Sequence, residues 1–409
     1  MFSILTLVIA VRFLWIPIFD KIDLRLVLAR LNVRIDYSIQ RKGFMLITSL
    51  LASSFMYLAA CVGLKFGITT FAALTSIACF WLANCDSIAL AYLHETIQAK
   101  DVGGMSTAGY RVGIFSTTVL SLYIYENFGI GWPALFKVYS VVMFLLNLLI
   151  IFAPREVPYT APSFQQAFVL PYKDLIKKYG FSLLVIVLFI ILFKISDRFV
   201  SPLEAMFLRS NFTSHEFFVL KFLSTFALTF AAVKSDGLLK KVGFKNSFLI
   251  SIIGNVLLIF SYFLCTLKNV YAYLASALLS CVIFTVFHRF GQAKSKYFSH
   301  LALIALGLVV GYYFGLPLHM LAIFAAVIVA KMISGIRAST LYSYEFSLAS
   351  QKYSLAQITI ISCMEQSVNT LFGSSSGHYV DKFGWTGLYL IALGLTFLPL
   401  LVWKWIRRD

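Results

Sequence analysis

The chain has 409 residues, of which 60% are hydrophobic and only 12% are charged. A soluble domain has roughly 45 to 50% apolar residues, so this composition excludes a soluble protein and indicates a polytopic membrane protein. The formal net charge is +17. The basic residues are scattered between apolar runs, so we assign them to membrane loops and expect no nucleic acid partner.

Apolar runs long enough to cross about 30 Å of hydrocarbon recur along the whole chain. They predict an all-α polytopic fold with about thirteen transmembrane helices. Short connections at 65–67 and 315–317 predict tight hairpins. The runs lie near residues 1–19, 44–64, 68–93, 105–126, 131–153, 180–200, 214–233, 246–266, 269–288, 298–315, 317–338, 355–378 and 385–406.

Loop charge predicts the orientation of these helices. Of the 34 lysines and arginines, 24 fall in one alternate set of connections and 7 in the other. Because basic loops stay on the cytoplasmic side, we expect the C-terminus in the cytoplasm and the N-terminus outside. Residues 1–19 carry Arg12 and end in Asp20 without a cleavage site, so we interpret them as a membrane helix and not as a secretory signal.

The connection 154–179 is polar, basic and rich in proline, and it divides the chain into bundles at 1–153 and 180–409. Within it, 164–179 is compatible with an interfacial helix in which Phe164, Phe168 and Leu175 dip into the membrane and Pro171 introduces a kink. A disordered linker is the alternative.

An internal repeat relates the two bundles. The stretch 125–132 contains Tyr-Glu-Asn-Phe-Gly followed by Gly-Trp, and 379–385 contains Tyr-Val-Asp-Lys-Phe-Gly-Trp. Each stretch precedes the last span of its half. Repeats in corresponding places predict two pseudo-symmetric bundles, as in transporters that rock about a central site.

Two acidic residues lie inside apolar runs, Asp86 in 68–93 and Glu365 in 355–378. A carboxylate in hydrocarbon costs roughly 2.5 to 3.5 kcal/mol, so each needs a cavity, a partner or a proton. Both are candidates for proton coupling, because desolvation favours the protonated acid. The alternative for Asp86 is structural pairing with Arg12 or Arg111.

Several motifs together resemble the AmpG-type muropeptide permeases of the major facilitator superfamily. The resemblance extends over most of the chain, and Gly-Tyr-Arg-x-Gly at 109–113 is its most specific part. The matching residues are Arg12-Phe13-Leu14-Trp15 with Pro17 and Asp20, then Asp86, Gly109-Tyr110-Arg111-Val112-Gly113, Lys194 with Asp197, and Gly384-Trp385.

This resemblance implies a proton-driven importer of anhydromuropeptides in the bacterial inner membrane, with protons, membrane lipid and a small-molecule solute as partners. Candidate residues for solute binding or gating are Asn84, Tyr110, Arg111, Lys194 and Asp197. Arg111 suits a solute carboxylate because its guanidinium donates two parallel hydrogen bonds, although it could instead bind Glu95 or Asp101. The candidates for a cytoplasmic gate are Arg12, Asp20 and Asp236. The alternative is that these residues are ordinary helix-end charges.

The sequence departs from the family pattern in three places. The family's first helix is absent, Leu90 stands where the pattern has a second carboxylate, and an extra hairpin is expected at about 268–316. A transport-dead remnant or interaction subunit therefore stays an alternative, as does transport of another solute such as acetyl-CoA. Histidines and cysteines show no metal spacing, so we expect no metal or cofactor. A membrane acyltransferase is the weakest alternative.

Overall fold

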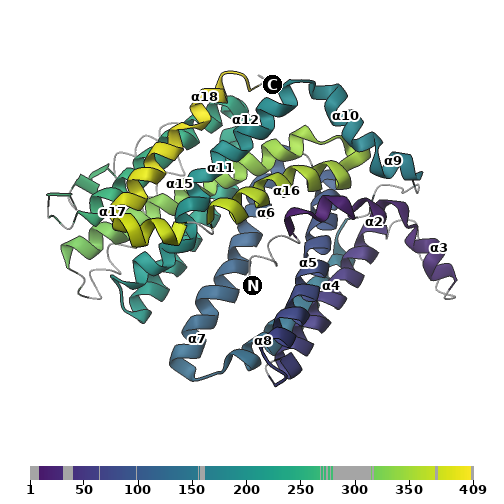
Figure 1. Ribbon diagram of the computed structural model, residues 1–409, viewed down its shortest axis with the longest axis horizontal. Coiled ribbons are helices and arrows are strands. Elements are labelled where there is room, and N and C mark those ends of the chain that lie inside the picture. The colour runs from purple at the N-terminus through teal and green to yellow at the C-terminus, as the bar shows by residue number, and fades with distance from the viewer. Residues whose placement is uncertain are drawn as a thin grey trace. The chain divides into compact units, whose positions relative to one another are not determined.

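A computed structural model describes residues 9–30, 40–63, 65–97, 99–154, 156, 162–267, 269, 271–272, 275–276, 278–279, 315, 317–373 and 376–406. Over these residues the regular secondary structure is helical, which confirms the all-α prediction (Figure 1). The expected hairpin at 268–316 falls mostly outside the described residues.

Seven of the described helical stretches are long and apolar enough to cross a membrane. An eighth results if α10 (Leu170–Tyr179) and α11 (Ser182–Arg209), bent by 96° at their junction, form one span. The predicted count of about thirteen is therefore not confirmed. The seven stretches are Gln40–Gly63, Ile68–Thr96, Trp132–Phe152, Ser214–Ser235, Leu239–Thr266, Met320–Leu348 and Ser376–Trp403.

The expected membrane helix at 1–19 is broken where the structure describes it. A 3-10 turn, η1 (Arg12–Leu14), is followed by the short helix α2 (Pro17–Lys21), with Trp15 and Ile16 in a turn between them. Pro17 explains the break, because proline has no N–H to donate and its ring clashes with the carbonyl four residues earlier. Residues 1–8 lie outside the described residues.

The chain divides into two compact units, each described here by itself. Unit 1 comprises Met1–Ala99, Ile124–Leu183 and Glu345–Thr370. In it, α4 packs against α5 and α8 (Figure 1), and Ile16, Ile88 and Leu355 belong to one buried core. Its further helices are α3 (Leu24–Ala29), α4 (Gln40–Leu58), η3 (Ala59–Gly63), α5 (Ile68–Thr96), α7 (Ser121–Phe128), α8 (Trp132–Leu148), η5 (Leu149–Phe152), η6 (Gln351–Tyr353) and most of α16 (Ser354–Gly373).

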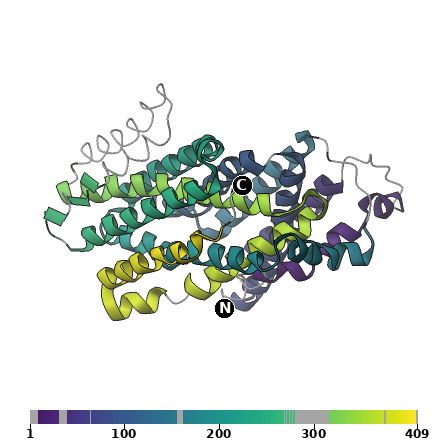
Figure 2. The ribbon, with the colours of Figure 1, turned by 90° about the horizontal axis from the view of Figure 1, so that it is seen from above.

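Unit 2 comprises Lys100–Tyr123, Leu184–Tyr344 and Leu371–Asp409. In it, α17 packs against α12 (Figure 2), and a buried aromatic and aliphatic core includes Phe207, Leu220 and Tyr389. The predicted boundaries at 153 and 180 stay a prediction. The helices of this unit are α6 (Ala99–Ile114), η4 (Phe115–Leu120), α11, α12 (Ser214–Thr266), α15 (Leu318–Leu348), α17 (Ser376–Phe397) and α18 (Pro399–Trp403).

The connection after α8 contains two helices, α9 (Phe164–Phe168) and α10. Ser163 and Gln166 form a reciprocal capping box at the start of α9, which satisfies backbone N–H groups that lack helical partners. Pro171 lies in the first turn of α10, where its missing N–H costs nothing. The structure describes helices over most of 164–179, and Leu175 is buried inside unit 1.

The two halves of the predicted repeat share a backbone conformation. Gly129 has φ +65° and Gly384 has φ +66°, a left-handed region that glycine enters without steric penalty. Gly129 lies between α7 and α8, and Gly384 interrupts α17. The glycine common to both stretches therefore terminates a helix in each.

Candidate functional site

The acid expected to be central, Asp86, is paired with Arg12. The Arg12 guanidinium donates to Oδ2 of Asp86 at 2.8 Å and also to the Ala83 carbonyl at 3.1 Å and the Ser362 hydroxyl at 2.9 Å. Arg12 is buried, whereas the Asp86 side chain keeps 55% of its exposure. The break before Pro17 brings Arg12 to α5, and Asp86 keeps an open side that a proton can reach.

Asn84, two residues before Asp86 on α5, accepts a hydrogen bond from Trp15. The Trp15 indole donates to Oδ1 of Asn84 at 2.9 Å. Asn84 is fully buried, and its Nδ2 has no hydrogen-bond partner among the described residues. A buried amide group with an unused donor is costly, so Nδ2 is a candidate donor to a bound molecule.

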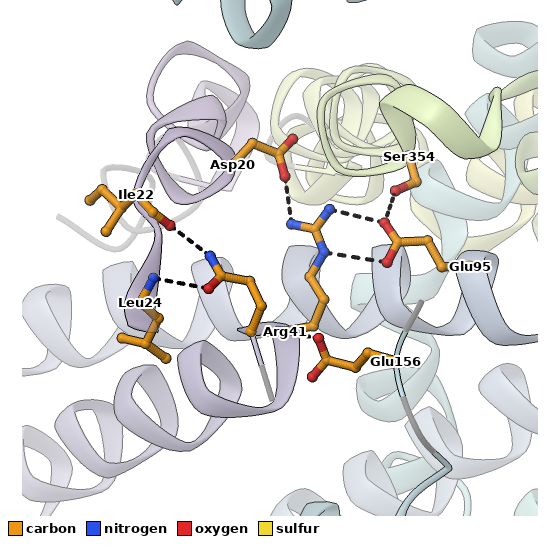
Figure 3. Close-up of polar contacts among 8 residues, drawn as sticks. Asp20, Ile22, Leu24, Arg41, Glu95, Glu156 and Ser354 are labelled. Atoms are coloured by element: carbon orange, nitrogen blue, oxygen red, sulfur yellow. Dashed lines mark hydrogen bonds and ion pairs between the residues drawn. The ribbon is translucent and has the colours of Figure 1, made fainter. Parts of the chain in front are cut away.

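A second charge network lies where α2, α4, α5 and α16 meet (Figure 3). The Arg41 guanidinium donates to Asp20 at 2.6 Å and to Glu95 at 2.9 Å, and the Ser354 hydroxyl also donates to Glu95. The expected gate residue Asp20 thus has Arg41 as its partner, while Arg12 belongs to the Asp86 pair. Glu95 was one of the two partners considered for Arg111, and the structure pairs it with Arg41.

Glu156 closes the network at the start of α4. Its carboxylate accepts the backbone N–H groups of Arg41 and Lys42, each at 2.7 Å. An acid at a helix N-terminus satisfies free N–H groups and interacts favourably with the helix dipole. Burial raises the pKa of Glu156 despite these bonds, and burial also raises the pKa of Asp20 despite the attraction of Arg41.

In unit 2, Asp197 pairs with Arg337 across α11 and α15. The guanidinium donates to Oδ1 of Asp197 and to the Phe193 carbonyl, both at 2.5 Å, and lies over the Phe193 ring. Lys194, three residues before Asp197, is buried. A local Lys194–Asp197 pair was one interpretation of their spacing; the partner found for Asp197 is Arg337.

Farther along the same two helices, Glu204 lies between two lysines. Lys221 approaches one carboxylate oxygen at 3.4 Å and Lys331 donates to the other. Asp197 and Glu204 are seven residues apart on α11, which is about two turns, so both face the same side. Residue 197 of α11 pairs with 337 of α15, and 204 pairs with 331. The number rises along one helix as it falls along the other, so α11 and α15 are antiparallel.

Tyr110 and Arg111 lie on α6. Tyr110 is exposed and the Arg111 guanidinium lies 5.6 Å from its ring centre. Nε of Arg111 has no hydrogen-bond partner among the described residues. The Asp101 side chain, the other partner considered for Arg111, lies outside the described residues.

The remaining candidates are less defined. Glu365 is buried in α16. The side chain of Asp236 is outside the described residues, so its role in a gate stays a prediction. In the described part of the chain, no three His, Cys, Asp or Glu side chains come close enough to hold a metal ion.

Six charged residues of these clusters were not singled out by the motifs: Arg41, Glu156, Glu204, Lys221, Lys331 and Arg337. Arg41, Lys221 and Arg337 were counted as loop charges, yet they lie within helices. Lys331 lies inside the expected span 317–338, and this position is the signal that the sequence offers. A lysine in hydrocarbon needs a counterion, although sequence spacing does not identify Glu204.

Comparison with known proteins places these clusters in a family context. No protein-family model matches the chain. The chain is 23% identical over 408 residues to a Rickettsia typhi protein named transporter AmpG 2, covering 98% of this chain and 84% of that protein. It is 21% identical to the anhydromuropeptide permease of Escherichia coli K12, covering 96% of this chain and 69% of the permease.

Solved structures give the fold. The human organic anion transporter MFSD10 matches with a TM-score of 0.59 at 13% identity, covering 98% of this chain and 83% of that structure. The fucose:proton symporter FucP of E. coli matches with a TM-score of 0.58 at 12% identity, covering 100% and 97%.

The chain has the fold of the major facilitator transporters, and its relatives are named as transporters and permeases. Together with the apolar helices, these likenesses support a multi-pass membrane transporter. Within that class, the resemblance to the AmpG-type permeases that the sequence motifs indicated is confirmed by the relatives above.

Proposed function

We propose that the chain is a proton-coupled importer of anhydromuropeptides in the bacterial inner membrane. The solute is suggested by the relative named anhydromuropeptide permease, which this chain matches over 96% of its own length. The coupling rests on one observation, the ion pair between buried Arg12 and half-exposed Asp86 on a membrane-spanning helix. In this proposal the N-terminus is outside and the C-terminus is cytoplasmic.

Asp86 is the proton carrier in this proposal. Protonation removes its negative charge and weakens the bond from Arg12, which stays anchored by the Ala83 carbonyl and the Ser362 hydroxyl. A carboxylate that alternates between a proton and a fixed cation links the protonation state to a local rearrangement. Glu365 is the corresponding acid of the second half.

Solute binding is assigned to polar side chains on the helices α5, α6 and α11. Asn84 contributes its unused amide donor. Arg111 binds a solute carboxylate in bidentate fashion, and Tyr110 contributes its exposed ring. Lys194 and Asp197 on α11 are further candidates.

The cytoplasmic gate is assigned to the Asp20–Arg41–Glu95 network, with Asp236 and Arg12 as further candidates. Arg41 holds two acids from different helices, so movement of α2 away from α5 has to separate at least one ion pair. Such a network resists opening until the gain from solute binding exceeds the cost of separation.

Uptake of labelled anhydromuropeptide tests the proposal in cells that lack their own permease and express this chain. We expect uptake that collapses when a protonophore is added. No uptake, with the protein present in the membrane at normal abundance, would overturn the assignment of the solute. Uptake that is insensitive to the protonophore would overturn the assignment of coupling. Labelled acetyl-CoA in the same cells tests the other solute considered.

A further inference from the structure

The cluster around Glu204 contains more positive than negative charge. Lys221 and Lys331 both bind this one carboxylate. The Glu204 side chain keeps only 9% of its exposure, and Leu203, Phe207 and Leu220 nearby are buried core residues. Uncompensated charge in apolar surroundings is unfavourable, so the two lysines can accept a second negative group.

The geometry of Glu204 indicates what that group is. Each lysine uses a different oxygen of the same carboxylate, so Glu204 bridges the two ammonium groups. An ammonium group has three donors, and within the described part of the chain neither lysine has another hydrogen-bond acceptor. The ammonium groups of Lys221 and Lys331 are therefore arranged to bind one carboxylate, and in this structure that carboxylate belongs to Glu204.

The lysines are accessible to a ligand. The Lys331 side chain keeps 21% of its exposure and the Lys221 side chain 14%. Lys331 lies near the middle of the 31-residue helix α15, about 20 Å from the nearer end. Lipid headgroups lie near helix ends, so a small solute reaches this depth more readily than a lipid phosphate.

We propose that Lys221 and Lys331 form a binding seat for the carboxylate of a small anionic solute, with Glu204 as an internal anion that competes for the same two cations. This inference deepens the proposed function by assigning an anion-binding subsite. It rests on the chain being a transporter but does not require the solute to be a muropeptide.

The test measures thermal stabilisation of the purified full-length protein by succinate, at constant ionic strength, in neutral detergent without added lipid. We expect succinate to raise the melting temperature of the wild type. In Glu204→Gln the internal competitor is gone, so half-maximal stabilisation should occur at a succinate concentration about 10-fold lower. Lys221→Gln and Lys331→Gln should each require about 10-fold more.

Lys382→Met is the matched control, because Lys382 is an exposed lysine of the same unit that lies over the Phe383 ring. Its response to succinate should equal that of the wild type. Inorganic phosphate and phosphatidylglycerol test the other sources of an anion. A stronger and lysine-dependent response to phosphatidylglycerol than to succinate would overturn the assignment to a solute.

An unchanged succinate response in both lysine variants would overturn the seat, as would no stabilisation of Glu204→Gln. If one lysine variant does not fold, the other and Glu204→Gln decide the question. Failure of muropeptide uptake with an intact succinate response would reject the proposed solute and leave the seat standing.

Discussion

At the scale of single residues, the account depends on which partner each buried charge has. Asp86 was expected to need a partner, and Arg12 provides one at 2.8 Å. The sequence predicted that Asp86 could pair with a basic residue, and both Arg12 and Arg111 were candidates for that partner. Only the path of the chain around Pro17 decides between them, because these contacts join residues more than seventy positions apart.

Replacing Asp86 with Asn tests the coupling. The Asn side chain has no carboxylate that can take up and release a proton. We therefore expect Asp86→Asn to abolish protonophore-sensitive uptake while membrane abundance stays at the wild-type level. Uptake of labelled anhydromuropeptide and immunoblotting of membranes measure the two quantities. Normal proton-driven uptake by this variant would remove Asp86 from the mechanism.

Replacing Arg41 with Met tests the stability of the network in Figure 3. Asp20 and Glu95 would then face each other without their shared cation, and loss of one partner from a buried ion pair costs about 3 kcal/mol or more. We expect a lower melting temperature for Arg41→Met in detergent, partly restored by adding Glu95→Gln. Lys65→Met, at an exposed turn, is the control. Equal melting temperatures for Arg41→Met and the control would contradict this role.

At the scale of helices, the network that joins α2, α4 and α5 should respond to pH. Burial raises the pKa of Asp20, partly offset by Arg41, so the folded protein holds this proton more tightly than the unfolded chain. The resulting stabilisation is complete below the unfolded pKa, near 3.9, and is lost as pH rises through the higher folded pKa.

We therefore expect the melting temperature of the wild type to fall more steeply with rising pH, above the unfolded pKa, than that of Asp20→Asn. The comparison uses the slope, because the substitution also changes the absolute stability through Arg41. Parallel pH profiles for the two proteins would show that Asp20 does not titrate differently in the folded state.

Close packing of α12 against α15 depends on Gly335. A Cβ atom there would lie 2.3 Å from the Leu228 carbonyl oxygen, so the helices would have to move apart. Overpacking of this kind costs about 1 to 3 kcal/mol, and Gly335→Ala should lower the melting temperature. Gly394→Ala is the matched helical control because no atom lies within 4 Å of its added Cβ. A neutral Gly335→Ala would mean that the helices adjust without cost.

At the scale of the whole molecule, composition and apolar periodicity predicted the polytopic all-α class, and motif spacing predicted the AmpG-type resemblance. The repeat that relates 125–132 to 379–385 shares a glycine, and the structure gives this glycine the same conformation at 129 and 384. These features are local, so a sequence pattern contains them.

Helix partners are not local. Arg41, Lys221 and Arg337 were counted with the loop charges, yet each lies inside a helix opposite an acid. A buried ion pair permits a helix to continue through a charged position, and hydropathy alone does not reveal that partner. The sequence therefore singled out Asp20, Asp86 and Asp197 but missed Glu156, Glu204 and most of the basic residues that pair with acids.

Proton movement driven by the solute tests proton-coupled transport by this chain directly. The purified protein is placed in liposomes containing a pH-sensitive dye, and anhydromuropeptide is added outside without an imposed gradient. The account predicts that the lumen acidifies with the wild type and not with Asp86→Asn. Entry of labelled solute without acidification, or no entry at all, would contradict proton-coupled transport of this solute.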